Sequence, residues 1–236
     1  MQAMSITENI AAVRQAIAQA AVAAGRIADD VQLLAVSKTF GSEAVIEAAQ
    51  AGQVAFGENY LQEALDKMQA VRVQRPDLNL TWHFIGPIQS NKTRPIAEHF
   101  DWVHSVDREK IAQRLSDQRP EALPPLQVCL QVNVSGEASK SGVEPDALLP
   151  LARAVAAMPR LRLRGLMAIP EPAESFEAQR QPFRQLRELQ AQLAAHGIIT
   201  DTLSMGMSAD MGAAIAEGSS IVRVGTAIFG KRDYAK

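Results

Sequence analysis

The stretch DTLSMGMSADMGAAIAEGSSIVRVGTAIFG, residues 201–230, holds the pattern that decides the fold. Residues 201–208 predict a strand, residues 209–218 predict a helix, and residues 220–230 predict a second strand. Two strands joined through a helix are typical of a βαβ unit, in which the strands run parallel and the connection is right-handed. The same unit recurs along the rest of the chain.

Six further segments predict strands, and nearly every one is followed by a helical pattern. They are residues 33–38, 53–59, 81–87, 101–107, 126–134 and 161–169. Eight such units in 236 residues predict an α/β protein with a single (β/α)8 TIM-type barrel domain over residues 1–236. An open doubly wound sheet is the alternative that the alternation alone leaves open.

A helix is predicted before the first strand. Ser5 and Glu8 have the spacing of a capping box, apolar residues then recur with helical period over 10–24, and Gly25 is the expected stop. After the sixth strand, the proline-rich segment 169–183 is predicted to be a long loop.

Composition narrows the class of protein. The net charge is −2, so no basic field indicates nucleic-acid binding. No basic segment precedes an apolar stretch at the N-terminus, and no apolar run approaches the ~18 residues of a membrane span. The single cysteine, Cys129, allows no disulfide within the chain and favours a reducing compartment. We therefore expect a cytoplasmic protein without a membrane segment.

The ends of the last two strands carry small and hydroxyl residues. Ser204, Gly206 and Ser208 precede a helix, and Gly225 and Thr226 follow the apolar part of the last strand. Small residues let backbone amides approach an anion, and this end of a (β/α)8 barrel is its usual phosphate site. The alternative is that small residues only ease the packing of helices on strands. Both motifs at adjacent strand ends favour a phosphate-bearing ligand.

Lys38 ends the first strand, LLAVSK. If its side chain points into the barrel mouth, Leu34 and Val36 lie beneath it, while Leu33 and Ala35 (with Ser37) face the helices. An apolar floor disfavours the charged form of an amine and makes it a usable nucleophile for a Schiff base. A lysine that merely reaches solvent at a strand exit is the alternative.

A nucleophilic lysine beside a phosphate site indicates one of two chemistries. One is an aldolase acting on a sugar phosphate, and the other is binding of pyridoxal 5′-phosphate (PLP). Arg223, two residues before Gly225, favours PLP, because an arginine can face the pyridine nitrogen.

Long motifs in the chain closely resemble the PLP homeostasis proteins, a family of PLP-binding barrels related to the barrel domain of alanine racemase. These motifs are LLAVSKT, FGENYLQEA, WHFIGPIQSNK, HSVDR, QVNVSGEASKSG, RLRGLMAIP, LSMGMSADM and IVRVGTAIFG, and the resemblance runs from about residue 5 to the C-terminus. It implies a protein of PLP homeostasis, a reversible carrier or buffer of PLP without classical PLP-enzyme activity.

The resemblance also implies roles for individual residues. Lys38 would carry PLP as a covalent aldimine, and Arg223 would face the pyridine nitrogen. Asn59 would lie near the lysine and the ring, as would His83. The phosphate would be held by Ser204, Gly225 and Thr226, with backbone amides near Met205 and Gly206. The chain departs from the family at Gly212, where an acidic residue is common, which concerns the stability of that helix.

A racemase remains the alternative function. Two-base racemisation needs a second acid or base facing Lys38. In alanine racemase-like enzymes a second domain after the barrel brings a tyrosine for this role, and no such domain is expected here. The two tyrosines, Tyr60 and Tyr234, do not match it. A carrier that delivers PLP to apo PLP-dependent enzymes is therefore favoured over a weak amino-acid racemase or a Schiff-base aldolase, and we expect a monomer or weak dimer.

Two further groups are expected to play no part in the main site. Lys140 lies in a loop at the same barrel end and could be a second amine for the aldehyde, although a solvated loop lysine is the simpler interpretation. His99, His104 and His196 show no metal-ligand spacing with each other or with Cys129, so no metal site is predicted.

Overall fold

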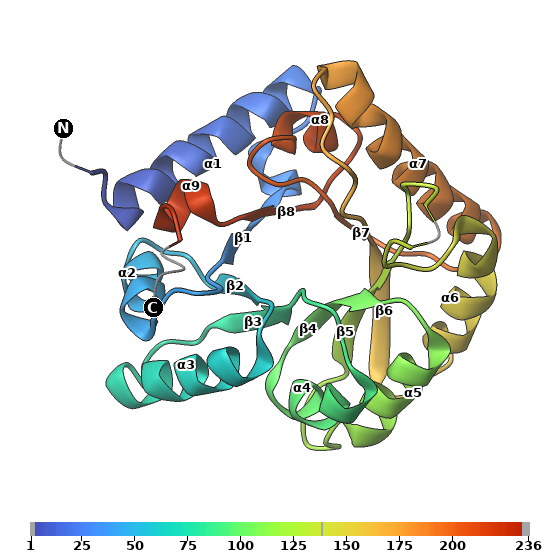
Figure 1. The fold of residues 1–236 in the computed structure, drawn as a ribbon, viewed down its shortest axis with the longest axis horizontal. Helices are drawn as coiled ribbons and strands as arrows, with labels where there is room; N and C mark the ends of the chain where they lie inside the picture. Colours follow the sequence, from blue (N-terminus) through green and yellow to red (C-terminus); the bar gives the residue numbers. More distant parts are fainter. Residues whose placement is uncertain (1–2, 138, 233–236) are drawn as a thin grey trace.

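Eight parallel strands close into a barrel, in the order β1 to β8, and helices surround it (Figure 1). The computed structural model describes residues 3–137 and 139–232. The (β/α)8 barrel and its preceding helix are confirmed, and the open doubly wound sheet is wrong. Each strand pairs in parallel with the next one along the chain, and β8 pairs with β1.

The elements follow in strict alternation after the first helix. The strands are β1 Gln32–Val36, β2 Ala55–Glu58, β3 Thr81–Phe84, β4 Trp102–Val106, β5 Leu126–Gln131, β6 Leu161–Met167, β7 Thr202–Ser204 and β8 Ile221–Val224. The α-helices are α1 Ile6–Ala23, α2 Ser42–Gln50, α3 Leu61–Gln74, α4 Thr93–His99, α5 Glu109–Gln118, α6 Leu148–Ala156, α7 Phe176–Ala195, α8 Met211–Ala216 and α9 Thr226–Phe229. Short 3₁₀ turns lie at Ala28–Asp30, Ser90–Lys92 and Pro145–Ala147.

Helix α1 begins and ends as its sequence predicts. The Ser5 amide donates to Glu8 Oε2 at 2.7 Å, and the Glu8 amide donates to Ser5 Oγ at 3.2 Å, which completes the capping box. Gly25 follows the helix with φ of +69°, a conformation that glycine adopts at little cost. The helix lies against α8 and α9 (Figure 1), so it covers the outside of β1 and β8.

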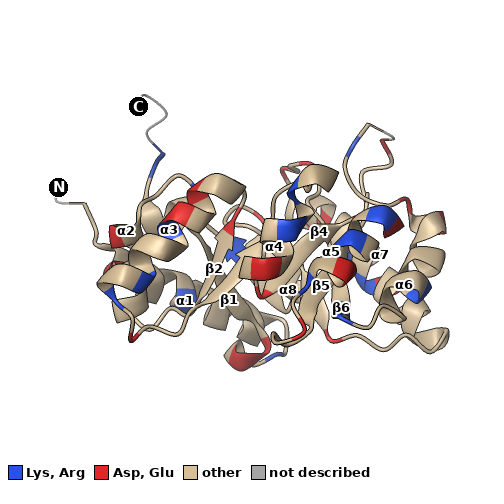
Figure 2. Cartoon of the chain, turned by 90° about the horizontal axis from the view of Figure 1, so that it is seen from below, with Lys and Arg blue, Asp and Glu red and all other residues tan. Residues whose placement is uncertain are grey.

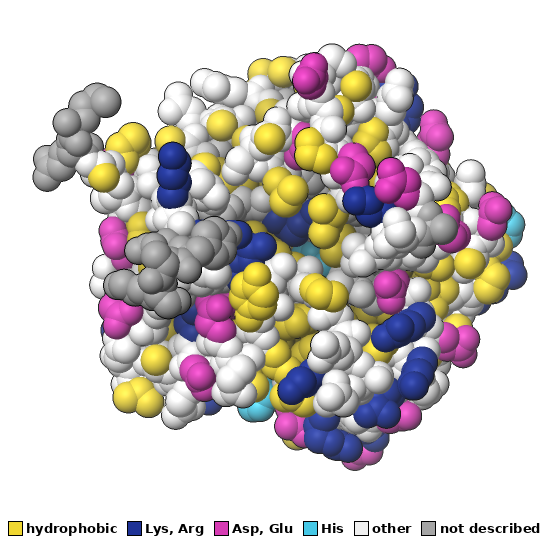
Figure 3. Space-filling model, in the orientation of Figure 1, with side chains coloured by type: hydrophobic (Ala, Val, Ile, Leu, Met, Phe, Trp, Pro, Cys, Tyr) yellow, Lys and Arg dark blue, Asp and Glu magenta, His cyan; other side chains and the backbone are white. Residues whose placement is uncertain are grey.

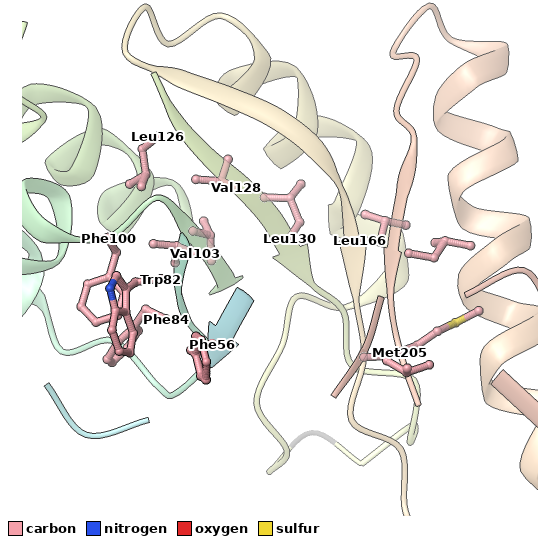
Figure 4. Packing of buried hydrophobic residues seen from close by; sticks show 14 of the residues in the cluster. Phe56, Trp82, Phe84, Phe100, Val103, Leu126, Val128, Leu130, Leu166 and Met205 are labelled. Atoms are coloured by element: carbon pink, nitrogen blue, oxygen red, sulfur yellow. The ribbon is translucent and has the colours of Figure 1, made fainter. Parts of the chain in front are cut away.

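The two faces of β1 pack into different cores, as the alternation of the strand predicts. Leu34 and Val36 lie in a small cluster inside the barrel with Ala55, Ile85 and Ile221. Leu33 and Ala35 belong instead to the large core between strands and helices. Figure 4 shows part of that large core. In it, the rings of Phe84 and Phe100 pack edge to face, with their centroids 5.2 Å apart.

Several boundaries differ from the sequence prediction, and two differ most. The strand predicted over 220–230 ends at Val224, and helix α9 begins at Thr226. The long loop predicted over 169–183 is wrong in its second half, because α7 begins at Phe176 and contains Pro182. Ser175 caps this helix by accepting from the Ala178 amide at 3.1 Å, and that local signal outweighs the proline.

The charged residues lie mainly on the outer helices and loops, with neither sign gathered on one side in the view of Figure 2. In the described part of the chain, no helix combines the length and the apolar character that a bilayer crossing needs.

Candidate functional site

A cavity of about 500 Å³ opens at the carboxyl ends of the strands. In Figure 3 the same region is a hollow at the centre of the face, with basic side chains and histidine visible in it. Its lining is contributed by residues at or just after the carboxyl ends of β1, β2, β3, β6, β7 and β8. These are Val36, Lys38, Asn59, Ile85, Ile169, Met207, Ser208, Ala209, Arg223, Gly225, Thr226 and Arg232.

Five of the nine residues predicted for the site therefore share one cavity: Lys38, Asn59, Arg223, Gly225 and Thr226. Lys38 reaches it because the sheet pairing continues one residue past β1, where the Ser37 amide donates to Gly57 O at 3.0 Å. Val36 lines the cavity below the lysine and is buried. The amine is thus half-buried above an apolar floor.

The β8 end of the cavity combines a glycine, the start of a short helix and basic side chains. A Cβ on Gly225 would lie 3.3 Å from both Val36 O and Arg232 Nη2, so a larger residue would crowd this corner. Helix α9 begins at Thr226, and the first amides of a helix lack partners within it. Three basic side chains, of Lys38, Arg223 and Arg232, line the same space.

Arg223 is held rigidly inside the barrel. Its Nη1 donates to Ser204 Oγ at 2.7 Å and its Nη2 donates to Ala168 O at 3.0 Å. Burial lowers the pKa of its guanidinium to about 10. Within residues 3–137 and 139–232, no carboxylate lies within ion-pair distance of it, so this buried cation is available to a polar group of a ligand.

A chain of hydrogen bonds runs from Arg223 through the barrel interior. Ser204 Oγ lies 2.7 Å from His104 Nδ1, and His104 Nε2 lies 2.8 Å from His83 Nδ1. Because a guanidinium only donates, the serine hydroxyl is best satisfied by donating onward to His104 Nδ1. The same direction then has His104 donate to His83, which places the His83 hydrogen on Nε2. His83 also stacks on Trp102, with ring centroids 5.2 Å apart.

Asn59 completes the polar lining on the β2 side. Its Oδ1 is buried and makes no hydrogen bond within the described part of the chain. Its backbone is packed so closely that a Cβ on Gly86 would lie 2.5 Å from Asn59 O. Arg232 lines this cavity, and its Nε is likewise buried without a partner among the described residues. The unpaired acceptor on Asn59 and the unpaired donor on Arg232 are compatible with a polar ligand. The amine of Lys38, the arginines and the start of α9 are compatible with a phosphorylated aldehyde such as PLP.

Comparison with known proteins places the chain in a family. Residues 5–233 match the family model described as alanine racemase, N-terminal domain. Over 230 residues the chain is 64% identical to the pyridoxal phosphate homeostasis protein of Pseudomonas aeruginosa, a match that covers 98% of this chain and 97% of that one. The chain belongs to the pyridoxal phosphate homeostasis protein family.

Two further relatives support the same family and its fold. The protein of that name from Vibrio cholerae is 60% identical over 232 residues, covering 98% of each chain. The solved structure of PipY from Synechococcus elongatus with PLP bound is 37% identical, covers 96% of this chain and all of that one, and superposes with a TM-score of 0.83. The family resemblance seen in the motifs is therefore confirmed.

Four residues predicted for the site lie behind the cavity rather than in its lining. His83 and Ser204 belong to the hydrogen-bond chain that ends on Arg223. The Met205 amide donates to Ile221 O at 3.1 Å, so the sheet already occupies this N–H. Gly206 accepts from the Arg223 amide at 2.9 Å. These contacts connect His83, Ser204 and Gly206 to Arg223 and hold Met205 in the sheet.

Several lining residues were not singled out from the sequence. The loop after β7 contributes Met207 and Ala209 beside Ser208, which the SMGMS motif had already indicated. Arg232 follows the last helix, and nothing in its sequence pattern indicates that it turns back over Gly225. His104 carries no local signal either, because its partner Ser204 is 100 residues away.

The remaining candidates lie outside the cavity lining. Lys140 pairs with Glu171 at 2.5 Å on the surface, which agrees with the simpler interpretation of a solvated lysine. Tyr60 is 52% exposed, and Tyr234 lies outside the described residues. No group of three His, Cys, Asp or Glu side chains suited to a metal ion is found in the part of the chain that the structure describes.

The buried histidine pair is expected to make stability fall in acid. Burial lowers the pKa of His83 to about 3, and burial, with His83 and Arg223 nearby, holds the pKa of His104 well below its usual value. In the unfolded chain both histidines take up a proton near pH 6.5. Above that pH, the two neutral rings therefore make their full contribution to the free energy of unfolding. It is lost as the pH falls toward 3, at about 1.4 kcal/mol per histidine per pH unit.

Urea unfolding at pH 7 and pH 5 measures this effect. A His104→Asn variant should lose less stability between the two pH values than the wild-type chain, while the exposed-site control His196→Asn should match the wild type. Equal losses in the His104 variant and the wild type would contradict the assignment of neutral, buried rings.

Proposed function

We propose that this protein binds PLP through a reversible covalent bond to Lys38 and acts as a carrier or buffer of PLP, not as a PLP enzyme. The observation that carries the proposal is the meeting of Lys38, Arg223, Gly225 and Thr226 in one cavity. The names of its relatives and the PLP bound to PipY support it. PLP supplies an aldehyde, whose carbon forms a C=N bond with an amine and releases water.

Each group in the cavity then has a task. Lys38 provides the amine. The corner at Gly225 and Thr226 receives the phosphate, and Arg232 adds a positive charge beside it. Asn59 Oδ1 accepts a hydrogen bond from the ligand, and Arg223 donates one to the pyridine nitrogen.

The hydrogen-bond chain behind Arg223 argues against strong carbanion chemistry. With Nη1 and Nη2 fixed on Ser204 and Ala168, the guanidinium presents a donor to the ring nitrogen and has no proton-accepting atom. A pyridine nitrogen that accepts a hydrogen bond stays unprotonated, and an unprotonated ring withdraws electrons less strongly. Removal of a proton from a bound amino acid is therefore disfavoured.

The cavity lining also lacks a second acid or base. Among the described residues that line it, none is Tyr, His, Cys, Asp or Glu, and burial lowers the pKa of His83, behind the lining, to about 3, which makes it a weak base. Two-base racemisation and proton transfer in a Schiff-base aldolase both need such a group. This observation favours the carrier over the two enzyme alternatives.

Two assays on PLP-loaded protein separate these functions. A carrier should restore activity to an apo PLP-dependent enzyme in excess, and should leave L-alanine unracemised over the same period. Racemisation of alanine at more than about 1 turnover per second, a rate within the ordinary enzyme range, would overturn the carrier proposal in favour of a racemase.

A further inference from the structure

Three charged side chains lie behind Lys38, on the side away from the cavity. Lys67, from α3, places its Nζ 2.5 Å from Glu58 Oε1 and 3.1 Å from Glu63 Oε1. The Lys67 and Glu58 side chains are only 3% and 0% exposed. We call Glu58, Glu63 and Lys67 the Lys67 cluster. None of its members lines the cavity, so the proposed binding of PLP leaves these buried charges unexplained.

The Lys67 cluster holds the backbone on both sides of Lys38. On one side, Lys67 Nζ donates to Ser37 O at 2.7 Å, and Ser37 Oγ donates to Glu58 Oε1 at 2.7 Å. On the other side, the Thr39 amide donates to Glu63 Oε1 at 2.6 Å. The residues before and after Lys38 are therefore both tied to one buried ion network.

The residue after Lys38 needs such a restraint. Thr39 has φ of +70°, and it is the one non-glycine residue with positive φ in the described ranges. A left-handed conformation is rare for a β-branched residue and costs roughly 1–2 kcal/mol, so it persists only where surrounding contacts enforce it. Thr39 is exposed, so packing does not enforce it; the Phe40 amide closes a turn on Ser37 O at 3.1 Å, and the bond to Glu63 is the side-chain restraint on this turn.

Stability alone is a poor reason for the Lys67 cluster. Burying an ion pair removes both charges from water, and the loss of hydration often cancels their attraction. Burial raises the pKa of Glu58 even though Lys67 opposes that shift, and Glu58 Oε2 has no hydrogen-bond partner among the described residues. The Lys67 cluster adds little to the free energy of unfolding, but it fixes the backbone at Ser37 and Thr39. It is therefore better suited to orienting Lys38, which lies between them.

We infer that the Lys67 cluster is a positioning device that aims the Lys38 amine into the cavity. This inference rests on the proposed function. With the backbone fixed on both sides, the Cα–Cβ bond of Lys38 has one direction, and its amine nitrogen meets the aldehyde carbon in a reactive geometry. That nitrogen then bonds to the carbon, the aldehyde oxygen leaves as water, and C=N remains. A misplacement of about 1 Å can slow such a step on the order of 100-fold.

Glu63 offers the sharpest test, because its side chain is 33% exposed and its removal leaves the buried Glu58–Lys67 pair in place. Glu63→Ala removes the acceptor for the Thr39 amide. Glu63→Gln keeps an acceptor oxygen at the same place, so it should preserve the rate at which Lys38 forms the C=N bond. The measurements are the rate of C=N formation after mixing with PLP, followed by absorbance, and the Kd of pyridoxine 5′-phosphate, which has the phosphate but no aldehyde.

The expected results form one pattern. Glu63→Ala should form C=N at least about 10-fold more slowly than wild type, Glu63→Gln should stay within about 3-fold, and both should bind pyridoxine 5′-phosphate as the wild type does. An unchanged rate in Glu63→Ala, a Gln variant as slow as the Ala variant, or loss of pyridoxine 5′-phosphate binding would each overturn the inference. A wild-type chain that forms no C=N with PLP would instead refute the proposed function.

Discussion

A Lys38→Met variant is expected to lose covalent capture of PLP completely. Methionine keeps the apolar length of the side chain above Val36 but has no amine, so no C=N bond can form. The phosphate corner at Gly225 and Thr226 is untouched, and weak noncovalent binding should persist. Titration with PLP should give no new absorbance band at this site, and borohydride should add no mass to the protein at one equivalent of PLP.

The matched control is Lys110→Met, which removes an exposed lysine of α5. This variant should titrate like the wild-type chain, with one PLP bound per protein. Stoichiometric, borohydride-trapped PLP in the Lys38→Met protein would show that another amine is the main acceptor and would contradict the assignment.

Gly206→Ala is expected to be the most damaging small substitution near the site. Gly206 has φ of +100°, and a Cβ there would lie 2.6 Å from Ala214 Cβ in α8. The strained backbone costs about 1–3 kcal/mol, and the overpacking costs about 1–3 kcal/mol more. Because Gly206 O accepts from the Arg223 amide, the affinity for PLP should fall together with the stability.

Gly212→Ala is the control, since it adds the same methyl group to α8 where the nearest atom, Phe176 Cε2, is 3.8 Å away. Alanine favours a helix over glycine by up to about 1 kcal/mol, so this variant should be slightly more stable than the wild type. Urea unfolding measures both variants. A Gly206→Ala protein within about 0.5 kcal/mol of the wild type would contradict the close packing of this loop on α8.

Local patterns predicted the barrel well because each strand and helix carries its own periodicity. The alternation in LLAVSK placed Leu34 and Val36 inside the barrel and Lys38 at its mouth, and the structure agrees. The same rule brings together residues at strand ends, which is why Lys38 and Gly225, far apart in sequence, line one cavity.

Contacts between distant side chains could not be predicted in this way. Ser204 resembled a phosphate ligand because it lies in a loop motif, but its hydroxyl bonds Arg223 and His104 inside the barrel. The pairing of Lys67 with Glu58 depends on how α3 packs behind β2, which no local pattern specifies. Pro182 indicated a loop, although the Ser175 cap starts the helix before it.

The attachment of PLP to Lys38 is the central claim, and mapping the bond in the wild-type protein tests it most directly. The protein is mixed with slightly less than one equivalent of PLP, reduced with borohydride and digested, and the modified peptides are sequenced by mass spectrometry. We expect one modified peptide, with the reduced pyridoxyl group on Lys38. A label spread over surface lysines, or found mainly on another residue such as Lys140, would contradict it.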